Sequence, residues 1–247
     1  MKYIKKFENH DSYELFITSG DNPKPNVSYC VQENEVYYNP WIEPPYQGFC
    51  KLTLNDGDVI ELEGSGELTP AMTSRYFSSL VSAEIGEACT SIGAHAFNNR
   101  SNLTSVTIDD SVESIGDNAF RDCSGLASVT IGDSVESIGI NAFYGCGNLT
   151  SIEMPDGVTS IGNTVFYECS SLMSAVIYAT TPPTLGNSVF YGNASGRKIY
   201  VPSSSVNTYK AASGWSAYLH VGVIFRKKDL MMVQKNCIHS LLTITKN

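Results

Sequence analysis

Leucine recurs at a constant spacing of 23 residues through the middle of this chain. The repeated positions are Leu80, Leu103, Leu126, Leu149 and Leu172. Isoleucine and glycine follow the first four of them after 12 and 13 positions, and phenylalanine follows after 17 positions. A unit of this length cannot bury its own apolar side chains, so consecutive units must cover one another. The period therefore predicts an elongated solenoid whose equivalent side chains form internal columns, and not a globule around one pocket.

Residues 103–125 show how one unit is expected to fold. Val106 and Ile108 are β-branched and alternate with polar residues, which predicts a short strand with one face inward. A polar turn follows, and Gly116 permits a bend before Phe120, which we expect to anchor the far side of the coil. Because strands at equivalent positions stack side by side, about five coils are expected to build a parallel sheet on one face of a mostly β solenoid.

One unit matches a known repeat pattern closely. Its matching residues are Leu149, Ile152, Met154, Pro155, Val158, Ile161, Gly162, Phe166 and Cys169. They resemble the BspA-type leucine-rich-repeat family of bacterial proteins, whose pattern runs roughly L-x-x-I-x-I-P…V-x-x-I-G-x-x-A-F-x-x-C, and the unit departs from it only at Met154 and Val165. The resemblance covers about half of the chain. It implies a curved, non-enzymatic array used for attachment or recognition, at the bacterial surface or outside the cell.

The repeat loosens after Leu172, where three residues that include two prolines are inserted before the next leucine. The stretch that follows, residues 199–218, resembles the strand and short helix that close such arrays. We therefore expect the leucine-rich-repeat solenoid to occupy residues 80–202, and a C-terminal cap and tail to occupy residues 203–247. Apolar residues at helical spacing in the tail predict a helix that docks or forms a dimer, and docking is the outcome we expect.

The first 79 residues fit no register of the repeat and hold 12 of the 26 aromatic side chains. Residues 50–64 alternate between apolar and polar on either side of Asn-Asp-Gly at 55–57, which predicts a β-hairpin. Residues 1–79 are therefore expected to form a small β-rich module. A cap over the first coil is the interpretation we favour, and a second binding or assembly module is the alternative.

Composition excludes some classes of partner. The net charge of −9 and the single basic cluster at Arg226, Lys227 and Lys228 argue against nucleic acid, because phosphate neutralisation needs clustered cations. No apolar run reaches the roughly 20 residues that cross a bilayer, so no membrane insertion is expected. The N-terminal residues lack the apolar segment of about 7–15 residues that marks an export signal. The sequence therefore leaves localisation open, while the family resemblance suggests the cell surface or the extracellular space.

The seven cysteines cannot form a complete set of disulfides, since their number is odd. Cys123, Cys146 and Cys169 follow the repeat and lack the close pairing of a metal site. We expect them to be buried free thiols, with redox chemistry or metal binding as alternatives. Cys30 and Cys50 lie upstream of the repeats and could pair with each other.

Motifs for catalysis are not found in the sequence. It contains no GxSxG elbow, phosphate-binding loop, HExxH helix or dinucleotide fingerprint. The histidines are dispersed, and His95 takes the place held by Asn118 and Asn141 in later repeats, where a polar structural side chain is expected. We therefore expect neither an enzyme nor a bound metal or cofactor.

The outward positions of the predicted strands form the candidate binding face. Its residues are Ser82, Glu84, Ser105, Thr107, Ser128, Thr130, Ser151, Glu153, Ser174 and Tyr178. Most of these side chains are small, whereas interface hot spots favour Trp, Tyr and Arg. Larger candidates gather toward the C-terminal end, and they are Tyr178, Tyr191, Tyr200, Tyr209, Trp215 and Tyr218. Part of this aromatic set is expected to belong to the core.

A row of like charges is predicted at one turn of successive coils. It consists of Glu87, Asp110, Asp133 and Asp156. Carboxylates about 5 Å apart repel one another unless water or cations intervene. We expect a solvated acidic edge, with calcium capture as the alternative.

Two functions remain after these exclusions. The first is a monomeric, non-enzymatic scaffold that recognises a protein or a glycan through its sheet face or its aromatic C-terminal end. The second is a structural or assembly component of a surface layer or phage-like particle, attached through residues 1–79. Ligand binding by the repeats alone would favour the first, and loss of particle or surface incorporation after removal of residues 1–79 would favour the second.

Overall fold

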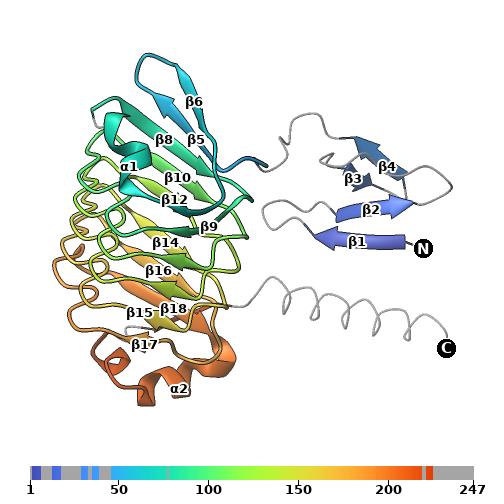
Figure 1. The fold of residues 1–247 in the computed structure, drawn as a ribbon. Helices are drawn as coiled ribbons and strands as arrows, with labels where there is room; N and C mark the ends of the chain where they lie inside the picture. Colours follow the sequence, from blue (N-terminus) through green and yellow to red (C-terminus); the bar gives the residue numbers. More distant parts are fainter. Residues whose placement is uncertain are drawn as a thin grey trace, which may run out of the picture. The chain divides into compact units, whose positions relative to one another are not determined.

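The computed structural model describes residues 46–76 and 78–218 in full and, outside them, the backbone of five strands. These strands are β1 (Lys2–Lys6), β2 (Tyr13–Ile17), β3 (Tyr29–Gln32), β4 (Glu35–Tyr38) and β19 (Val221–Ile224). The chain divides into two compact units, Met1–Tyr46 and Gln47–Asn247. In the first unit β1 pairs with β2 and β3 pairs with β4, both antiparallel. The second unit contains the repeats (Figure 1).

A parallel sheet of long strands forms one face of the repeats (Figure 1). Its strands are β8 (Leu80–Ile85), β10 (Ser105–Ile108), β12 (Ser128–Thr130), β14 (Ser151–Met154), β16 (Ser174–Ile177), β18 (Lys198–Pro202) and β19. The repeat step sets their register, so that Ser105 lies opposite Ser82 on one side and Ser128 on the other. Within the described residues the ladder is interrupted once, between β12 and β14. The parallel sheet expected on one face is confirmed.

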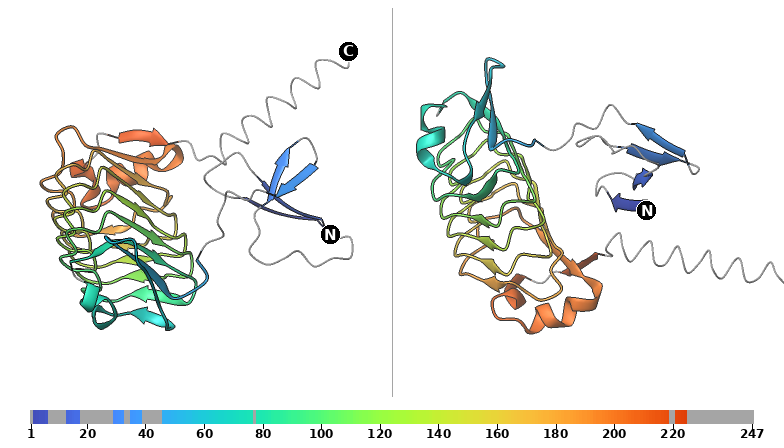
Figure 2. Two further views of the ribbon diagram at one scale, coloured as in Figure 1. Left: turned by 90° about the horizontal axis from the view of Figure 1, so that it is seen from above. Right: turned by 45° about the vertical axis from the view of Figure 1, so that its right-hand side comes forward.

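A second parallel sheet, which the sequence did not predict, lines another side of the same coils. Its strands are β7 (Gly66–Leu68), β9 (Cys89–Ile92), β11 (Ser114–Ile115), β13 (Ser137–Ile138), β15 (Ser160–Ile161) and β17 (Thr184–Leu185). Figure 2 shows these coils stacked on one another from two further directions. In β11 Ile115 is buried and Ser114 is half-buried. Strands of two residues are too short to show an alternating pattern, which explains why only a return to the core was predicted here.

A turn segment without strand geometry forms the remaining side of each coil. Alternate backbone N–H groups donate to the next coil, from Asn118 to Ile140 O over 2.8 Å and from Phe120 to Ala142 O over 2.7 Å. The N–H groups between them donate to the carbonyl three residues back in their own turn. The alternation places Asn118 and Asp122 in the left-handed region, both with φ of 56°. Asn and Asp adopt this region more readily than most L residues, so polar residues at these positions let the backbone donors find partners.

The repeated glycine after each short strand has a different role from the one expected. Gly116 was expected to permit a bend. A Cβ atom at Gly116 would lie 2.7 Å from the backbone nitrogen of Ala94 and 2.8 Å from Ile92 O, both in the preceding coil. Real Cβ atoms essentially never make contacts this short. The close approach of neighbouring coils therefore requires glycine here.

Phenylalanine side chains form a continuous column through the repeats. Phe97, Phe120, Phe143, Phe166 and Phe190 are buried and stack on their neighbours at centroid distances of 5.1, 5.1, 5.5 and 5.6 Å. Phe190 comes 24 residues after Phe166 instead of 23, and it still joins the column. The predicted internal columns are confirmed, and each buried side chain of this size contributes about 1.5–3 kcal/mol to stability.

The repeated cysteines form a column of hydrogen-bond donors beside the phenylalanines. Cys123 Sγ donates to Phe97 O over 3.0 Å, and the next two cysteines repeat this contact in the following coils. In the last coil Asn193 takes the same position, and its Nδ2 donates to Phe166 O over 2.7 Å. The cysteines of the fully described residues are all free and buried, and they are Cys50, Cys89, Cys123, Cys146 and Cys169. The Cys30 side chain lies outside the described residues.

Residues 47–79 belong to the same compact unit as the repeats. They contain β7 together with β5 (Cys50–Leu54), β6 (Val59–Leu62), α1 (Pro70–Thr73) and a 3-10 helix (Ser74–Tyr76). The hairpin expected around 55–57 is present, and its strand β5 pairs antiparallel with β8. Leu52 and Leu68 are buried in the common core. The boundary expected at residue 79 therefore falls inside one unit that begins at Gln47, because this segment buries its apolar side chains on the first coil.

The C-terminal end of the stack is covered by short helices. They are a 3-10 helix (Ser203–Ser205), α2 (Val206–Ala211) and a second 3-10 helix (Trp215–Tyr218). Tyr209 OH donates to Ala179 O over 2.9 Å, and Trp215 Nε1 donates to Pro183 O over 2.8 Å, so both buried aromatics belong to the core. Helices of the described residues all fall short of the length and apolarity needed to cross a bilayer. The helix expected in the tail falls on residues 229–247, which lie outside the described residues.

Candidate binding surfaces

The ten residues of the predicted binding face lie on one side of the long-strand sheet, which we call the sheet face. Register places the serines of β8, β10 and β12 opposite one another, and likewise those of β14 and β16. The row two positions further along the strands consists of Glu84, Thr107, Thr130, Glu153, Val176 and Tyr200. These side chains are exposed or half-buried, and Tyr178 directly follows β16. The structure therefore brings the predicted residues together.

Charged side chains occupy the N-terminal end of the sheet face. Lys51 on β5 lies opposite both Glu61 and Glu84, and its Nζ is 2.9 Å from Glu84 Oε1. The Lys51 and Glu84 side chains are 25% and 40% exposed. Solvent screens such a pair, which contributes only about 0–1 kcal/mol. The hairpin nevertheless gives Glu84 a cationic neighbour, so this residue of the predicted face is engaged within the chain.

Larger side chains gather at the C-terminal end of the sheet face. Val176 lies opposite Tyr200, and Tyr178 OH donates to Glu153 Oε2 over 2.9 Å. Met173, directly before β16, is 63% exposed, and the sequence pattern did not single it out. Tyrosine offers a large ring with a polar tip, which is the kind of side chain that anchors interfaces.

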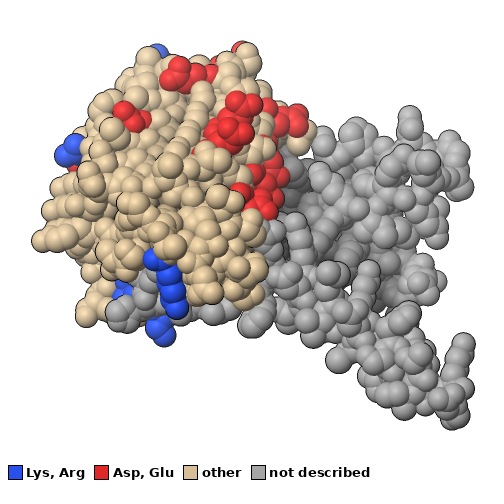
Figure 3. Space-filling model, turned by 90° about the horizontal axis from the view of Figure 1, so that it is seen from below, with Lys and Arg blue, Asp and Glu red and all other residues tan. Residues whose placement is uncertain are grey.

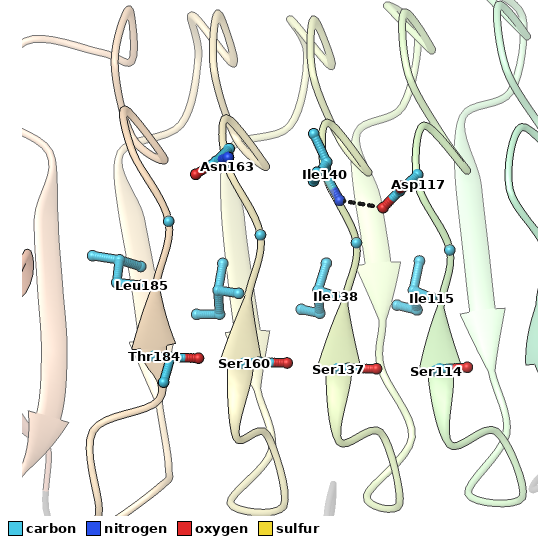
Figure 4. A pocket seen from close by; sticks show the side chains of 15 residues that line it. Ser114, Ile115, Asp117, Ser137, Ile138, Ile140, Ser160, Asn163, Thr184 and Leu185 are labelled. Atoms are coloured by element: carbon cyan, nitrogen blue, oxygen red, sulfur yellow. Dashed lines mark hydrogen bonds between the residues drawn. The ribbon is translucent and has the colours of Figure 1, made fainter.

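A shallow groove of about 590 Å³ runs along the second sheet (Figure 4). Together with the repeated glycines, its lining consists of Ser114, Ile115, Asp117, Ser137, Ile138, Ile140, Ser160, Ile161, Asn163, Thr184 and Leu185. Asp117 Oδ1 accepts a hydrogen bond from Ile140 N over 2.6 Å, and Asn163 Oδ1 accepts one from Asn187 N over 2.8 Å. These side chains therefore brace the next coil. Asp117 is the single titratable residue of the lining. The groove therefore does not bring an acid and a base together, as general acid–base catalysis requires.

The acidic row has a structural role in the stack. Asp110 Oδ1 accepts a hydrogen bond from the backbone N–H of Asp133 over 2.7 Å, so a carboxylate of one coil holds the backbone of the next. In residues 46–76 and 78–218, no three His, Cys, Asp or Glu side chains are grouped so that they could hold a metal ion. Figure 3 shows acidic side chains gathered on the face that it draws, apart from Lys and Arg. The row accordingly belongs to an acidic edge in which Asp110 also braces the next coil.

His95 and the cysteine column carry side-chain types that can act in catalysis. His95 has a left-handed backbone with φ of 62°, and its Nδ1 lies 3.1 Å from Asn98 Nδ2. Desolvation by burial raises the pKa of the Cys123 thiol from 9.0 to about 12. A thiol that stays protonated is a poor nucleophile. Both features fit the structural roles expected from the repeat.

Tyrosines on the turn segment form a further outward feature. Tyr144, Tyr167 and Tyr191 stack on one another at centroid distances of 5.1 and 4.9 Å. Tyr191 was named among the C-terminal aromatics, whereas Tyr144 and Tyr167 were missed. The signal that could have found them is the repeat step itself, since each tyrosine follows a phenylalanine of the buried column by one residue.

Coils of this length with internal leucine and phenylalanine columns and parallel ladders define a leucine-rich-repeat solenoid. Residues 77–213 match the BspA-type leucine-rich-repeat region in six copies. The chain belongs to this family, and the resemblance inferred from residues 149–169 is confirmed. No curated protein matches the chain.

Several solved structures of bacterial leucine-rich-repeat proteins are similar to this chain. The T. pallidum protein TpLRR is 28% identical with a TM-score of 0.43, over 46% of this chain and 52% of its own. The pneumococcal vaccine antigen PcpA is 20% identical with a TM-score of 0.49, over 72% and 48%. A leucine-rich cell surface protein from Faecalibacterium prausnitzii A2-165 is 21% identical with a TM-score of 0.43, over 83% and 56%. The chain spans about half the length of these proteins.

Proposed function

We propose that this chain is a non-enzymatic recognition scaffold that binds a protein or a glycan through its sheet face. The observation that supports this function most is the register of the long strands, which arranges the outward side chains of successive coils in rows. A surface held in this way loses little conformational entropy on binding. Membership of the BspA-type family, a family of bacterial surface repeat proteins, supports the same role.

Binding energy in this proposal comes mainly from the C-terminal half of the sheet face. Tyr178 and Tyr200 supply rings with polar tips, and Val176 adds apolar surface opposite Tyr200. A few large side chains usually carry most of the binding energy, while the smaller ones around them exclude water. The serine and threonine rows would provide that surround.

We further propose that the protein acts as a monomer, at the cell surface or outside the cell. Family membership supports this location. The monomeric state is supported by the two ends of the stack, where Leu52 of the hairpin and Trp215 of the cap are buried in the core. Because the chain covers its own terminal coils, a second copy is not needed to do so. Light scattering of the purified chain measures this directly, and a dimer mass would refute the monomer.

The division of the chain after Tyr46 favours a second candidate function, in which the first unit attaches the repeats to a surface layer or phage-like particle. Met1–Tyr46 has strand pairs of its own, β1 with β2 and β3 with β4. A deletion that tests this role should stop at Tyr46, because residues 47–79 pack on the first coil. Ligand binding that survives this deletion, together with loss of incorporation into the layer or particle, would support an attachment role.

The sheet-face proposal is tested by replacing the two tyrosine anchors in the full chain. Wild type and the double variant Tyr178→Ser/Tyr200→Ser are compared on a glycan array and against immobilised candidate proteins. We expect the double variant to lose at least about tenfold in affinity, which corresponds to about 1.4 kcal/mol. The control, Ser137→Ala on the second sheet, should bind as wild type does. Equal binding by the double variant would refute the sheet face as the site.

A further inference from the structure

The tyrosine column consists of Tyr144, Tyr167 and Tyr191, which hold one position in three successive coils. Their rings stack at 5.1 and 4.9 Å, with interplanar angles of 3° and 22°. Each tyrosine follows a phenylalanine of the buried column, so the inner rings fix the outer ones through the shared backbone. Rings held in this way before a partner arrives lose little side-chain entropy on binding, and tyrosine is a preferred anchor on preorganised surfaces.

Stacking leaves ring faces accessible only at the two ends of the column. Both faces of Tyr167 are covered by its neighbours. At the N-terminal end the guanidinium of Arg121 lies over the Tyr144 ring, 4.8 Å from its centroid. Arg121 Nε also lies 3.2 Å from Asp122 Oδ2, so the guanidinium contacts a ring and a carboxylate together. The chain itself therefore shows how an end of this column receives a planar cation.

The C-terminal end of the column is the ring of Tyr191, and a carboxylate is carried by the coil before it. Tyr191 is 60% exposed. Glu168 holds the position of Asp122 two coils later, and a Cβ at Gly192 would lie 3.0 Å from Glu168 Oε1. Glycine at this position, with φ of 72°, therefore lets the carboxylate lie close to the coil that carries Tyr191. Among the described residues, Glu168 makes no ion pair and no cation lies over Tyr191.

The nearby Arg197 does not fill this place, because its contacts are made elsewhere. Its guanidinium carbon lies 5.3 Å from the Phe190 ring centroid and 5.4 Å from that of Tyr218. Its Nη1 donates to Phe190 O over 2.6 Å and to Asn193 Oδ1 over 3.1 Å. These contacts tie Arg197 to the inner column and to the C-terminal cap. An exposed ring thus ends the column, and an exposed carboxylate reaches toward the same coil from the coil before it.

We propose that Tyr191 and Glu168 bind an arginine side chain of a protein partner, which stacks on Tyr191 as Arg121 stacks on Tyr144. Residues 46–218 carry 17 acidic and seven basic side chains, so a basic segment is attracted to this unit. Arginine fits better than lysine, because its planar guanidinium stacks on a ring and can bind a carboxylate through two parallel hydrogen bonds. A glycan fits less well, because the column presents ring edges along most of its length and only one accessible ring face, at its end. The site is separate from the sheet face.

The experiment uses the full chain with ¹³C-labelled tyrosine rings and the peptide acetyl-Gly-Arg-Gly-Arg-Gly amide. Nuclear magnetic resonance follows the ring signals, and the signal of Tyr191 is assigned by its loss in Tyr191→Phe. Matched peptides carry lysine, or citrulline, which keeps the planar group without the charge. At about 0.15 M ionic strength we expect the arginine peptide to shift the Tyr191 signal and to bind at least about twofold more tightly than the lysine peptide and fivefold more tightly than the citrulline peptide.

Variants then separate the ring from the charge, with affinity read from the Tyr167 signal. Tyr191→Ala should weaken the arginine peptide at least about fivefold, whereas Tyr191→Phe keeps the ring face and should bind as wild type does. Glu168→Gln should weaken binding. The control Glu63→Gln removes the same charge from an exposed position of the N-terminal segment and should not weaken it.

Three results would overturn the inference. The first is unchanged binding of the arginine peptide by Tyr191→Ala or Glu168→Gln. The second is no shift of the Tyr191 signal at millimolar peptide. The third is a shift confined to Tyr178 and Tyr200, which would move the peptide to the sheet face and leave the proposed function standing.

Discussion

Removing one ring from the middle of the phenylalanine column should show how much stability the column supplies. Phe120 is fully buried and stacks on Phe97 and Phe143 at 5.1 Å, with interplanar angles of 5° and 6°. A change from Phe to Ala in a core costs about 3–5 kcal/mol through lost transfer free energy and the cavity left behind. Stacking contributes about 0.5–1.5 kcal/mol per pair beyond buried area. Because the neighbouring rings are fixed by their own coils and cannot fill the gap, we expect Phe120→Ala to lower the free energy of unfolding by about 4–5 kcal/mol.

Urea unfolding followed by circular dichroism measures this loss, as the change in midpoint multiplied by the slope of the transition. The control is Thr107→Ala, an exposed position in the strand of the same coil, which should change the free energy by less than about 0.5 kcal/mol. Tyrosine fluorescence should report the same transition, since a repeat array can unfold in more than one step. Equal midpoints for the two variants would show that the inward and outward positions are assigned wrongly.

Three further predictions concern the cysteine column and the turn segment. Cys146→Ala removes the donor to Phe120 O and should lower the free energy of unfolding by about 1–3 kcal/mol. Cys146→Ser keeps a donor and should lower it less, and the reverse order in urea unfolding would contradict this reasoning. Burial raises the pKa of the Cys123 thiol from 9.0 to about 12, so its contribution is fully present below pH 9.0 and is lost as pH rises toward 12. Unfolding curves at rising pH should therefore bring wild type closer to Cys123→Ala, and a constant difference would refute the assignment. Asn99 has φ of 60°, so Asn99→Val should cost about 1–2 kcal/mol in a thermal melt and Asn99→Gly much less, while equal melting temperatures would argue against a left-handed turn.

The inward half of the fold could be predicted because a solenoid buries the same positions in every coil. Leu103 and Phe120 recur at one step because each coil needs the same side chain to cover its neighbour. The register of the long strands follows from the same step, which places Ser105 opposite Ser82. The aromatic residues toward the C-terminal end were harder to assign, because Trp215 is buried in the cap whereas Tyr191 is exposed.

Features that depend on the preceding coil could not be predicted from a single unit. The strand Ser114–Ile115 has too few positions to show an alternation, so its ladder was missed. Gly116 leaves room for the backbone of Ala94, and the thiol of Cys123 donates a hydrogen bond to the carbonyl oxygen of Phe97. Each reason lies about one repeat away in sequence and becomes visible only when the coils are stacked.

The binding surfaces are the least predictable part, because solvent imposes no period on outward side chains. Register places Ser128 and Tyr200 on one face without saying which of them meets a ligand. The tyrosine column is an exception, since any polar residue would be solvated at its position and yet tyrosine fills it in three successive coils. Two reasons are possible, and they separate by experiment. If mutual stacking of the rings is the reason, Tyr167→Ala at the centre of the column should lower stability more than Tyr191→Ala at its end. If ligand binding is the reason, Tyr191→Ala should lose affinity for the arginine peptide while its melting temperature changes little.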